Sequence, residues 1–276
     1  MFKFRIISFT ALLGVLSFIF FNQTYGVTVF LALAALVAGL AIYELGSMLE
    51  KLDLPSFKLD AAFFGATFVW LFGNSFFWQY WLMAAIILLP IILGWGALLC
   101  SKEFAYTAKK LAVSAGLLLL TLPLILGLML LGVASLNIFA YMVLVTKSGD
   151  TGAYCIGMLS NKITKGHNHP VAPHISPKKS IEGTVGGLVT AVGVSVLLGQ
   201  CCGLFAVPLS WLLLAGILLF WGGFFGDLTE SVLKRGCGIK DSGRILPGMG
   251  GVWDVLDSFI YNAPAFGLIF MILKLN

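Results

Sequence analysis

The chain has 276 residues, of which 59% are hydrophobic and only 11% are charged. A soluble domain usually carries about a quarter charged residues, so this composition excludes a water-soluble globular protein and indicates an integral membrane protein. The net charge of +5 comes from basic residues dispersed between apolar stretches, and we expect no nucleic acid among the partners.

Nine apolar stretches reach or approach the roughly 20 residues that a membrane-crossing helix needs. In chain order they lie at about 6–21, 26–43, 61–73, 76–98, 111–133, 137–159, 184–206, 209–227 and 252–273. We therefore predict an all-α, polytopic integral membrane protein with about nine transmembrane helices, and counts of eight or ten stay open. The first stretch lacks a small-x-small cleavage site, so we interpret it as a span and not as a signal peptide.

Basic residues alternate between the connecting loops. Fifteen of the seventeen Lys and Arg residues precede the first stretch or fall in every second loop, and the intervening loops hold none. Cytoplasmic loops of membrane proteins carry such an excess of basic residues. We therefore predict a cytoplasmic N-terminus and cytoplasmic basic loops. Separately, we expect a multi-pass location in the inner (plasma) membrane of a bacterium, with the active site facing the cytoplasm.

The character of the sequence changes near residue 135. Residues 1–135 hold apolar stretches with short connections, and we predict an N-terminal transmembrane scaffold there. Residues 136–276 hold the polar motifs and form the predicted catalytic transmembrane region with cytoplasmic loops, within one membrane domain overall. In the stretch 137–159, the segment KSGDTGAY sets Lys147 and Asp150 among glycines. This polar run predicts a break in the helix, lined by protein or water.

Three carboxylates are predicted to lie at similar depth. Asp227 ends the stretch 209–227, and Asp254 and Asp257 begin the stretch 252–273, so the topology places all three at the cytoplasmic boundary. Asp254 and Asp257 would share one helix face, because they are three residues apart. Acids at bilayer depth need partners, and a divalent cation such as Mg²⁺ is one solution.

Basic residues and a glycine turn surround these acids in the sequence. The turn PGMGG would offer free backbone N–H groups at the start of a helix, and nearby basic side chains suit phosphate groups. Acids for a metal and bases for phosphate together indicate phosphoryl or nucleotidyl transfer at the membrane surface.

Simpler interpretations of the same acids stay open at this point. Asp227 could pair with Lys234 or Arg235, and Glu230 and Lys234 have the spacing of an ordinary helix-surface pair. Asp254 and Asp257 could favour the positive end of their helix dipole.

The segment from Ser231 to Asp257 resembles the phosphatidate cytidylyltransferase family, also called CDP-diacylglycerol synthases. That family's signature reads roughly S-x₂-K-R-x₄-K-D-x-G-x₂-[LIF]-P-G-H-G-G-x₂-D-R-x-D. The segments DTGAY at 150–154 and SPKKSIEG at 176–183 also match the family. Two positions depart from the signature, since Met249 replaces the usual histidine and Val255 the usual arginine. The matching motifs cover about 146–258, and the N-terminal half is similar only in hydropathy.

The resemblance implies an enzyme that converts CTP and phosphatidic acid into CDP-diacylglycerol and pyrophosphate, with Mg²⁺ as cofactor. This reaction would belong to phospholipid biosynthesis and take place at the lipid bilayer. The resemblance also implies a metal site of Asp227, Asp254 and Asp257, and these acids with Lys240 and Asp241 as the catalytic group. The residues expected to bind substrate are Asp150, Lys178, Lys179, Lys234, Arg235, Arg244, Gly248, Gly250 and Gly251. Homo-oligomer formation stays open.

Two other functions fit part of the pattern. A CTP-dependent lipid-alcohol kinase would share the nucleotide and the membrane setting but would release CDP. A cation-coupled membrane transporter would also have broken helices and buried acids. The clustering of ionisable residues at one membrane face favours the enzyme.

Overall fold

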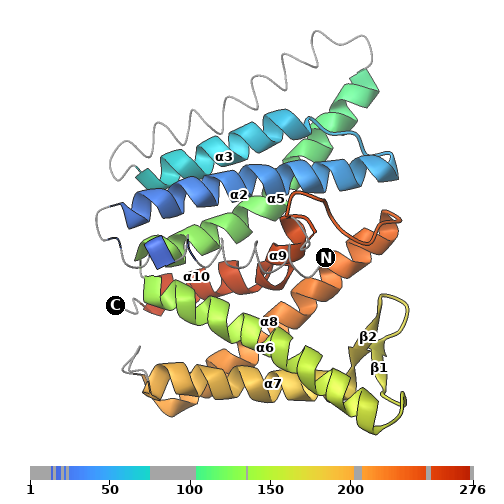
Figure 1. Ribbon diagram of the computed structural model, residues 1–276. Coiled ribbons are helices and arrows are strands. Elements are labelled where there is room, and N and C mark those ends of the chain that lie inside the picture. Colours follow the sequence, from blue (N-terminus) through green and yellow to red (C-terminus); the bar gives the residue numbers. More distant parts are fainter. Residues whose placement is uncertain are drawn as a thin grey trace. The chain divides into compact units, whose positions relative to one another are not determined.

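The computed structural model describes residues 25–74, 104–134, 136–201, 207–246 and 250–273, together with residues 14, 17–19 and 22. The predicted spans at 76–98 and, for the most part, 6–21 lie outside these residues. The described chain is mostly helical (Figure 1). It divides into two compact units: residues 1–133 with 236–255 form unit 1, and residues 134–235 with 256–276 form unit 2. The functional division at residue 135 stays a prediction.

Four described helices are long and apolar enough to cross a membrane, namely Gly26–Leu52, Ala105–Ile125, Ile181–Gln200 and Leu209–Gly236. They overlap four of the predicted stretches, namely 26–43, 111–133, 184–206 and 209–227. A helical protein with membrane-length helices is therefore confirmed in outline, whereas the count of nine and the orientation of the N-terminus stay predictions.

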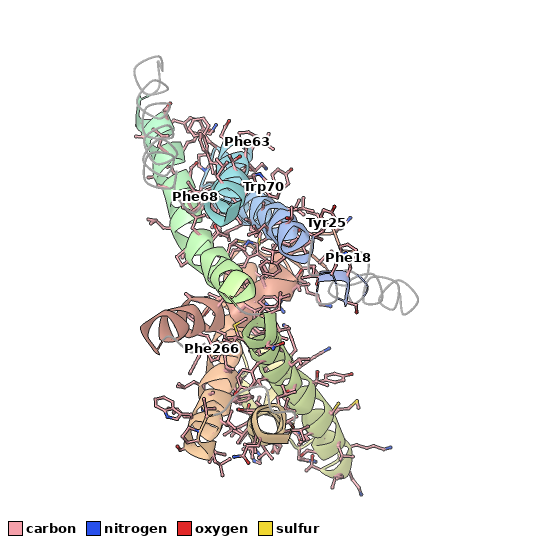
Figure 2. All side chains as sticks on the ribbon, turned by 90° about the vertical axis from the view of Figure 1, so that its left-hand side faces the viewer. Phe18, Tyr25, Phe63, Phe68, Trp70 and Phe266 are labelled. Atoms are coloured by element: carbon pink, nitrogen blue, oxygen red, sulfur yellow. The ribbon has the colours of Figure 1, made fainter. Side chains whose placement is uncertain are left out.

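Unit 1 is built on α2 (Gly26–Leu49), which continues into η1 (Glu50–Leu52), together with α3 (Lys58–Asn74) and α5 (Phe104–Ala134). Helices α2 and α3 lie side by side (Figure 1). They approach closely at Gly39, where an added Cβ would lie 3.3 Å from the carbonyl oxygen of Ala62. Phe63 and Trp70 project outward from α3 (Figure 2), as expected of a surface that faces lipid.

Unit 2 begins with α6 (Leu136–Ile163) and a hairpin of β1 (Pro170–Ala172) and β2 (Ser176–Ser180). Next come α7 (Ile181–Val196), the π-helical turn η2 (Leu197–Cys201) and α8 (Leu209–Gly236). The unit closes with η3 (Asp257–Phe259) and α10 (Asn262–Leu273). Tyr141 of α6 stacks on Phe266 of α10, with ring centroids 6.0 Å apart, and its hydroxyl lies 2.6 Å from Ser195 Oγ on α7.

The predicted break in the sixth span is wrong, because α6 runs without interruption from Leu136 to Ile163. The glycines of α6 allow close packing against a neighbouring helix. An added Cβ on Gly149 would lie 3.3 Å from the Cβ of Ala191, and one on Gly152 would collide with Thr190. Because both contacts lie on α7, the small residues let α6 and α7 approach closely along the polar segment.

The single helix predicted for 252–273 is also wrong. The short helix α9 (Trp253–Leu256) is followed by the 3₁₀ turn η3 and by a turn at Ile260–Tyr261, and only then does α10 begin. The boundary between the two units falls between Val255 and Leu256. Asp254 therefore belongs to unit 1 and Asp257 to unit 2. The prediction that both acids share one face of a regular helix is wrong, because the α-helix ends at Leu256, between them.

Candidate functional site

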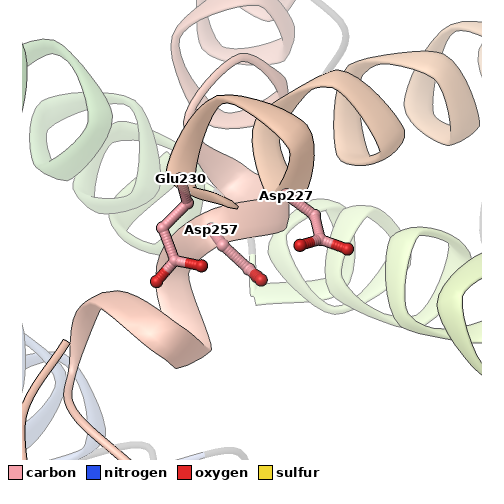
Figure 3. Close-up of side chains that lie close together, drawn as sticks. All are labelled: Asp227, Glu230 and Asp257. Carbon is pink, nitrogen blue, oxygen red and sulfur yellow. The ribbon is translucent and has the colours of Figure 1, made fainter. Parts of the chain in front are cut away.

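Three carboxylates gather where α8 meets η3 in unit 2. Asp227 and Glu230 lie three residues apart on α8, and Asp257 opens η3 (Figure 3). One oxygen from each lies within 4.8 Å of the others. The two α8 residues share a helix face because of their spacing. Such a set of oxygens could hold a hard divalent cation.

Glycines in α8 allow the chain around η3 to come this close. An added Cβ on Gly226 would collide with the backbone oxygen of Asp257, and one on Gly222 would collide with Asn262. The Asn262 side chain donates to Leu219 O at 2.7 Å and to Thr146 Oγ1 at 2.9 Å. The GxxxG spacing of Gly222 and Gly226 therefore allows this close contact of α8 with η3 and α10.

Glu230 is the member of this group that sequence reasoning missed. Its predicted pair with Lys234 forms, with 2.6 Å between Lys234 Nζ and Glu230 Oε2. The predicted surface location is wrong, because the Glu230 side chain is only 1% exposed. The i, i+3 spacing from Asp227 was the sequence signal that could have placed it in the site.

Lys179 of β2 reaches Asp227, with its ammonium 2.8 Å from Asp227 Oδ2. The same ammonium lies 4.3 Å from the ring centroid of Phe224 and donates to the Phe224 carbonyl at 3.3 Å. The ion-pair partner of Asp227 is therefore Lys179. The alternative pair of Asp227 with Lys234 is not formed, because Lys234 pairs with Glu230. Lys178 and Arg235 are exposed.

Lys147 holds the third carboxylate of the group, at 3.6 Å from Asp257 Oδ1. It also lies 3.3 Å from Asp150 Oδ2 and donates to Ser258 Oγ at 2.9 Å. The Ser258 hydroxyl lies 2.8 Å from both Asp150 Oδ2 and Asp257 Oδ1. In the sequence, Lys147 was noted as part of the polar segment KSGDTGAY but was not assigned to the site, and Ser258 was not noted.

Each of the three carboxylates thus lies beside one lysine. Asp227 pairs with Lys179, Glu230 with Lys234 and Asp257 with Lys147. These lysines come from β2, α8 and α6, so three separate elements balance the negative charge of the group. Of the residues predicted for the site, the structure brings together Asp150, Lys179, Asp227, Lys234 and Asp257 within unit 2.

Apart from Lys178 and Arg235, which lie in unit 2, the remaining predicted residues belong to unit 1. They lie in α9 and in the signature loop, which we define as residues 240–252. Asp254 accepts hydrogen bonds from Ser242 N at 3.0 Å and Gly251 N at 2.7 Å. Gly250 N donates to Leu246 O at 3.1 Å. The N–H groups of Gly250 and Gly251 are thus engaged inside the loop, so these two predicted donors are not free for a ligand.

Three polar members of the signature loop, Lys240, Asp241 and Arg244, are exposed. Gly250 has a φ of +96°, which a residue with a side chain rarely adopts, and this explains a glycine at the turn. Gly248 and Met249 lie outside the described residues. Val255 lies in α9 and is partly exposed.

Comparison with known proteins places the chain in a family. The profile of the cytidylyltransferase family matches residues 3–273. A phosphatidate cytidylyltransferase of Staphylococcus haemolyticus is 43% identical over 138 residues, which cover 49% of each chain. A protein of the same name from Bacillus subtilis is 40% identical over 124 residues, covering 45% of this chain and 44% of the relative.

A third similar protein is YnbB of Escherichia coli, an uncharacterized protein, which is 38% identical over 128 residues. The match covers 46% of this chain and 40% of that relative. The chain spans about half the length, or less, of the curated relatives that it matches. Because the family profile extends over nearly the whole sequence, the chain belongs to the cytidylyltransferase family.

Proposed function

We propose that the protein is a phosphatidate cytidylyltransferase, which converts CTP and phosphatidic acid into CDP-diacylglycerol and pyrophosphate. The observation that carries the proposal is the group of Asp227, Glu230 and Asp257, with oxygens within 4.8 Å and a lysine beside each. The names of the Staphylococcus and Bacillus relatives, both phosphatidate cytidylyltransferases, support the same substrates.

The donor set fits a magnesium ion, because three carboxylate oxygens from one small volume are hard ligands of the kind that Mg²⁺ takes with substrate phosphates. Asp227, Glu230 and Asp257 would hold it, and Asp254 stays a predicted ligand. When bound, Mg²⁺ would neutralise charge on the phosphates of CTP.

The reaction joins two anions, so the chain has mainly to position them and to offset their repulsion. A phosphate oxygen of phosphatidic acid forms a bond to the α-phosphorus of CTP, and the bond from that phosphorus to the bridging oxygen breaks as pyrophosphate leaves. The lipid phosphate is already ionised, so no side chain has to remove a proton. Lys179 and Lys147 lie close enough to the acids to turn towards an arriving phosphate.

The proposed setting is the cytoplasmic face of a bacterial inner membrane. Both Lys178 and Lys179 of β2 and the exposed Lys240 and Arg244 fall in loops that the charge pattern assigns to the cytoplasm. This side is where CTP is available. The bacterial source of the three similar proteins supports such a membrane.

The test uses the purified full chain in detergent with CTP labelled at the α-phosphate, phosphatidic acid and Mg²⁺. We expect a labelled lipid and an equal amount of pyrophosphate, and we expect both to disappear in Asp257→Asn. Release of CDP with a phosphorylated lipid alcohol as product would identify a kinase instead. Absence of any lipid product from a folded preparation would contradict the proposal.

A further inference from the structure

A buried glutamate in the N-terminal helix α2 fastens the signature loop. Glu44 is 3% exposed, and its Oε2 accepts hydrogen bonds from Trp253 N at 3.1 Å and from Ser242 Oγ at 3.3 Å. Three residues earlier on α2, Ala41 O accepts from the Trp253 indole at 2.6 Å. All these residues belong to unit 1, and the contacts hold the loop both near its start and just after its end.

The Ser242 hydroxyl links Glu44 to Asp254. Ser242 Oγ lies 3.0 Å from Asp254 Oδ2 and 3.3 Å from Glu44 Oε2. The same Asp254 oxygen accepts from the backbone of Ser242 and Gly251. Asp254 thus closes the loop on itself, and Glu44 attaches the closed loop to α2.

Two glycines of the signature pack directly on the Glu44 carboxylate. An added Cβ on Gly251 would lie 2.5 Å from Glu44 Oε2, and one on Gly243 would collide with Glu44 Oε1. Any side chain at either position would displace the carboxylate or the loop. At position 251 an added Cβ would also collide with Ser242 Oγ and with the backbone nitrogen of Gly243. The close approach of Glu44 therefore contributes to the need for glycine at 243 and 251.

We propose that Glu44 is a positioning residue that holds the signature loop in its working conformation. The buried Ser242 that Glu44 engages stands between Lys240 and Arg244, which are exposed. By fixing the backbone between them, Glu44 sets where these two cations can meet the phosphates of CTP. The kinetic part of this inference rests on the proposed function, whereas the attachment of the loop does not.

Limited proteolysis tests the attachment without any substrate. Trypsin cleaves after Arg244, inside the loop. In Glu44→Gln an amide N–H₂ replaces one carboxylate oxygen beside donors, so the loop should open more often. We expect cleavage after Arg244 to become about tenfold faster, a change typical of one lost buried hydrogen bond to a charged group. The control is Glu50→Gln in η1, a partly exposed residue bound to Lys58, which should leave the cleavage rate unchanged.

Trp253→Phe gives an independent perturbation, because it removes the indole N–H that donates to Ala41 O and keeps an aromatic ring. Gly243→Ala disturbs the same contact from the side of the loop. Both variants should speed cleavage after Arg244. Unchanged cleavage in folded Glu44→Gln and Trp253→Phe would overturn the inference, whatever the enzyme's activity.

Steady-state kinetics separate positioning from a merely structural role. We expect Glu44→Gln to raise the apparent KM for CTP about tenfold and to leave that for phosphatidic acid within twofold. A structural role would reduce the fraction of active enzyme, so kcat would fall with both KM values unchanged, and this result would contradict the inference. If the wild-type chain forms no CDP-diacylglycerol, the proposed function fails, and proteolysis still decides whether Glu44 holds the loop.

Discussion

Lys179 Nζ lies 2.8 Å from Asp227 Oδ2 and 4.3 Å from the ring centroid of Phe224. The carboxylate and the ring together restrict a flexible side chain that would otherwise lose entropy when it bound a phosphate. The lysine is therefore placed beside the carboxylate group before any substrate arrives. Through this side chain, strand β2 contacts helix α8 beside the carboxylate group.

Replacing Lys179 by methionine removes the charge and keeps much of the side-chain volume. We expect kcat/KM for cytidylyl transfer to fall about 100-fold, because a hydrogen bond to a charged group contributes roughly 1.5–3 kcal/mol. Lys162→Met, at the exposed end of α6, provides the control and should keep wild-type rates. Equal rates in the two variants would show that the Lys179 contact serves folding alone.

Glu230→Gln tests the acid that the sequence interpretation treated as a surface residue. An amide oxygen is a weaker ligand for Mg²⁺ than a carboxylate oxygen. We expect the Mg²⁺ concentration for half-maximal activity to rise at least tenfold, measured by titration with the metal after chelation. Glu182→Gln, which changes an exposed pair with His169, should not alter the Mg²⁺ titration. An unchanged titration in Glu230→Gln would remove Glu230 from the metal site.

Lys234→Gln should destabilise the fold by about 3 kcal/mol, because it leaves the buried Glu230 carboxylate without its lysine. The measurement is the thermal melting temperature in detergent. The double variant Lys234→Gln with Glu230→Gln should recover most of the loss, since no buried charge then remains unpaired. A melting temperature equal to that of the wild type in Lys234→Gln would contradict the burial of this pair.

Gly226→Ala should lower the stability by roughly 1–3 kcal/mol, because the new methyl group would collide with the backbone oxygen of Asp257. Gly193→Ala is the matched control, since an added Cβ on this α7 glycine meets no atom within 4 Å. Alanine there should be neutral or should stabilise the helix by about 0.5–1 kcal/mol. Comparable melting temperatures for both variants would argue against the close contact between α8 and η3.

Hydropathy predicted the helices well where one apolar run makes one helix. The stretches 26–43 and 209–227 became α2 and α8, each longer at its polar end because polar residues can continue a helix. The same reasoning failed at 252–273, where one helix was predicted and the chain forms a short helix, a 3₁₀ turn and a second helix. An apolar composition is compatible with either arrangement. Likewise, the glycines in KSGDTGAY indicate close packing as readily as a break, and only the neighbouring α7 decides between them.

The site was predicted where charge stood out against an apolar background. Asp227 and Asp257 were identified in this way, and the structure brings both into one group. Glu230 was missed because its i+4 lysine offered a sufficient local explanation. Glu44 was assigned to the scaffold, because its partners Ser242 and Trp253 lie about 200 residues further along the chain. Contacts at such separation leave no periodic pattern in the sequence.

The proposed activity of the chain is the transfer of a cytidylyl group from CTP to phosphatidic acid. The most direct measurement follows α-phosphate-labelled and γ-phosphate-labelled CTP in parallel with purified protein, phosphatidic acid and Mg²⁺. We expect the α-label to enter a lipid, the γ-label to appear in pyrophosphate in equal amount, and chelation of Mg²⁺ to stop both. Transfer of the γ-label to a lipid, or a lipid product formed equally well by Asp227→Asn, would contradict the proposed activity.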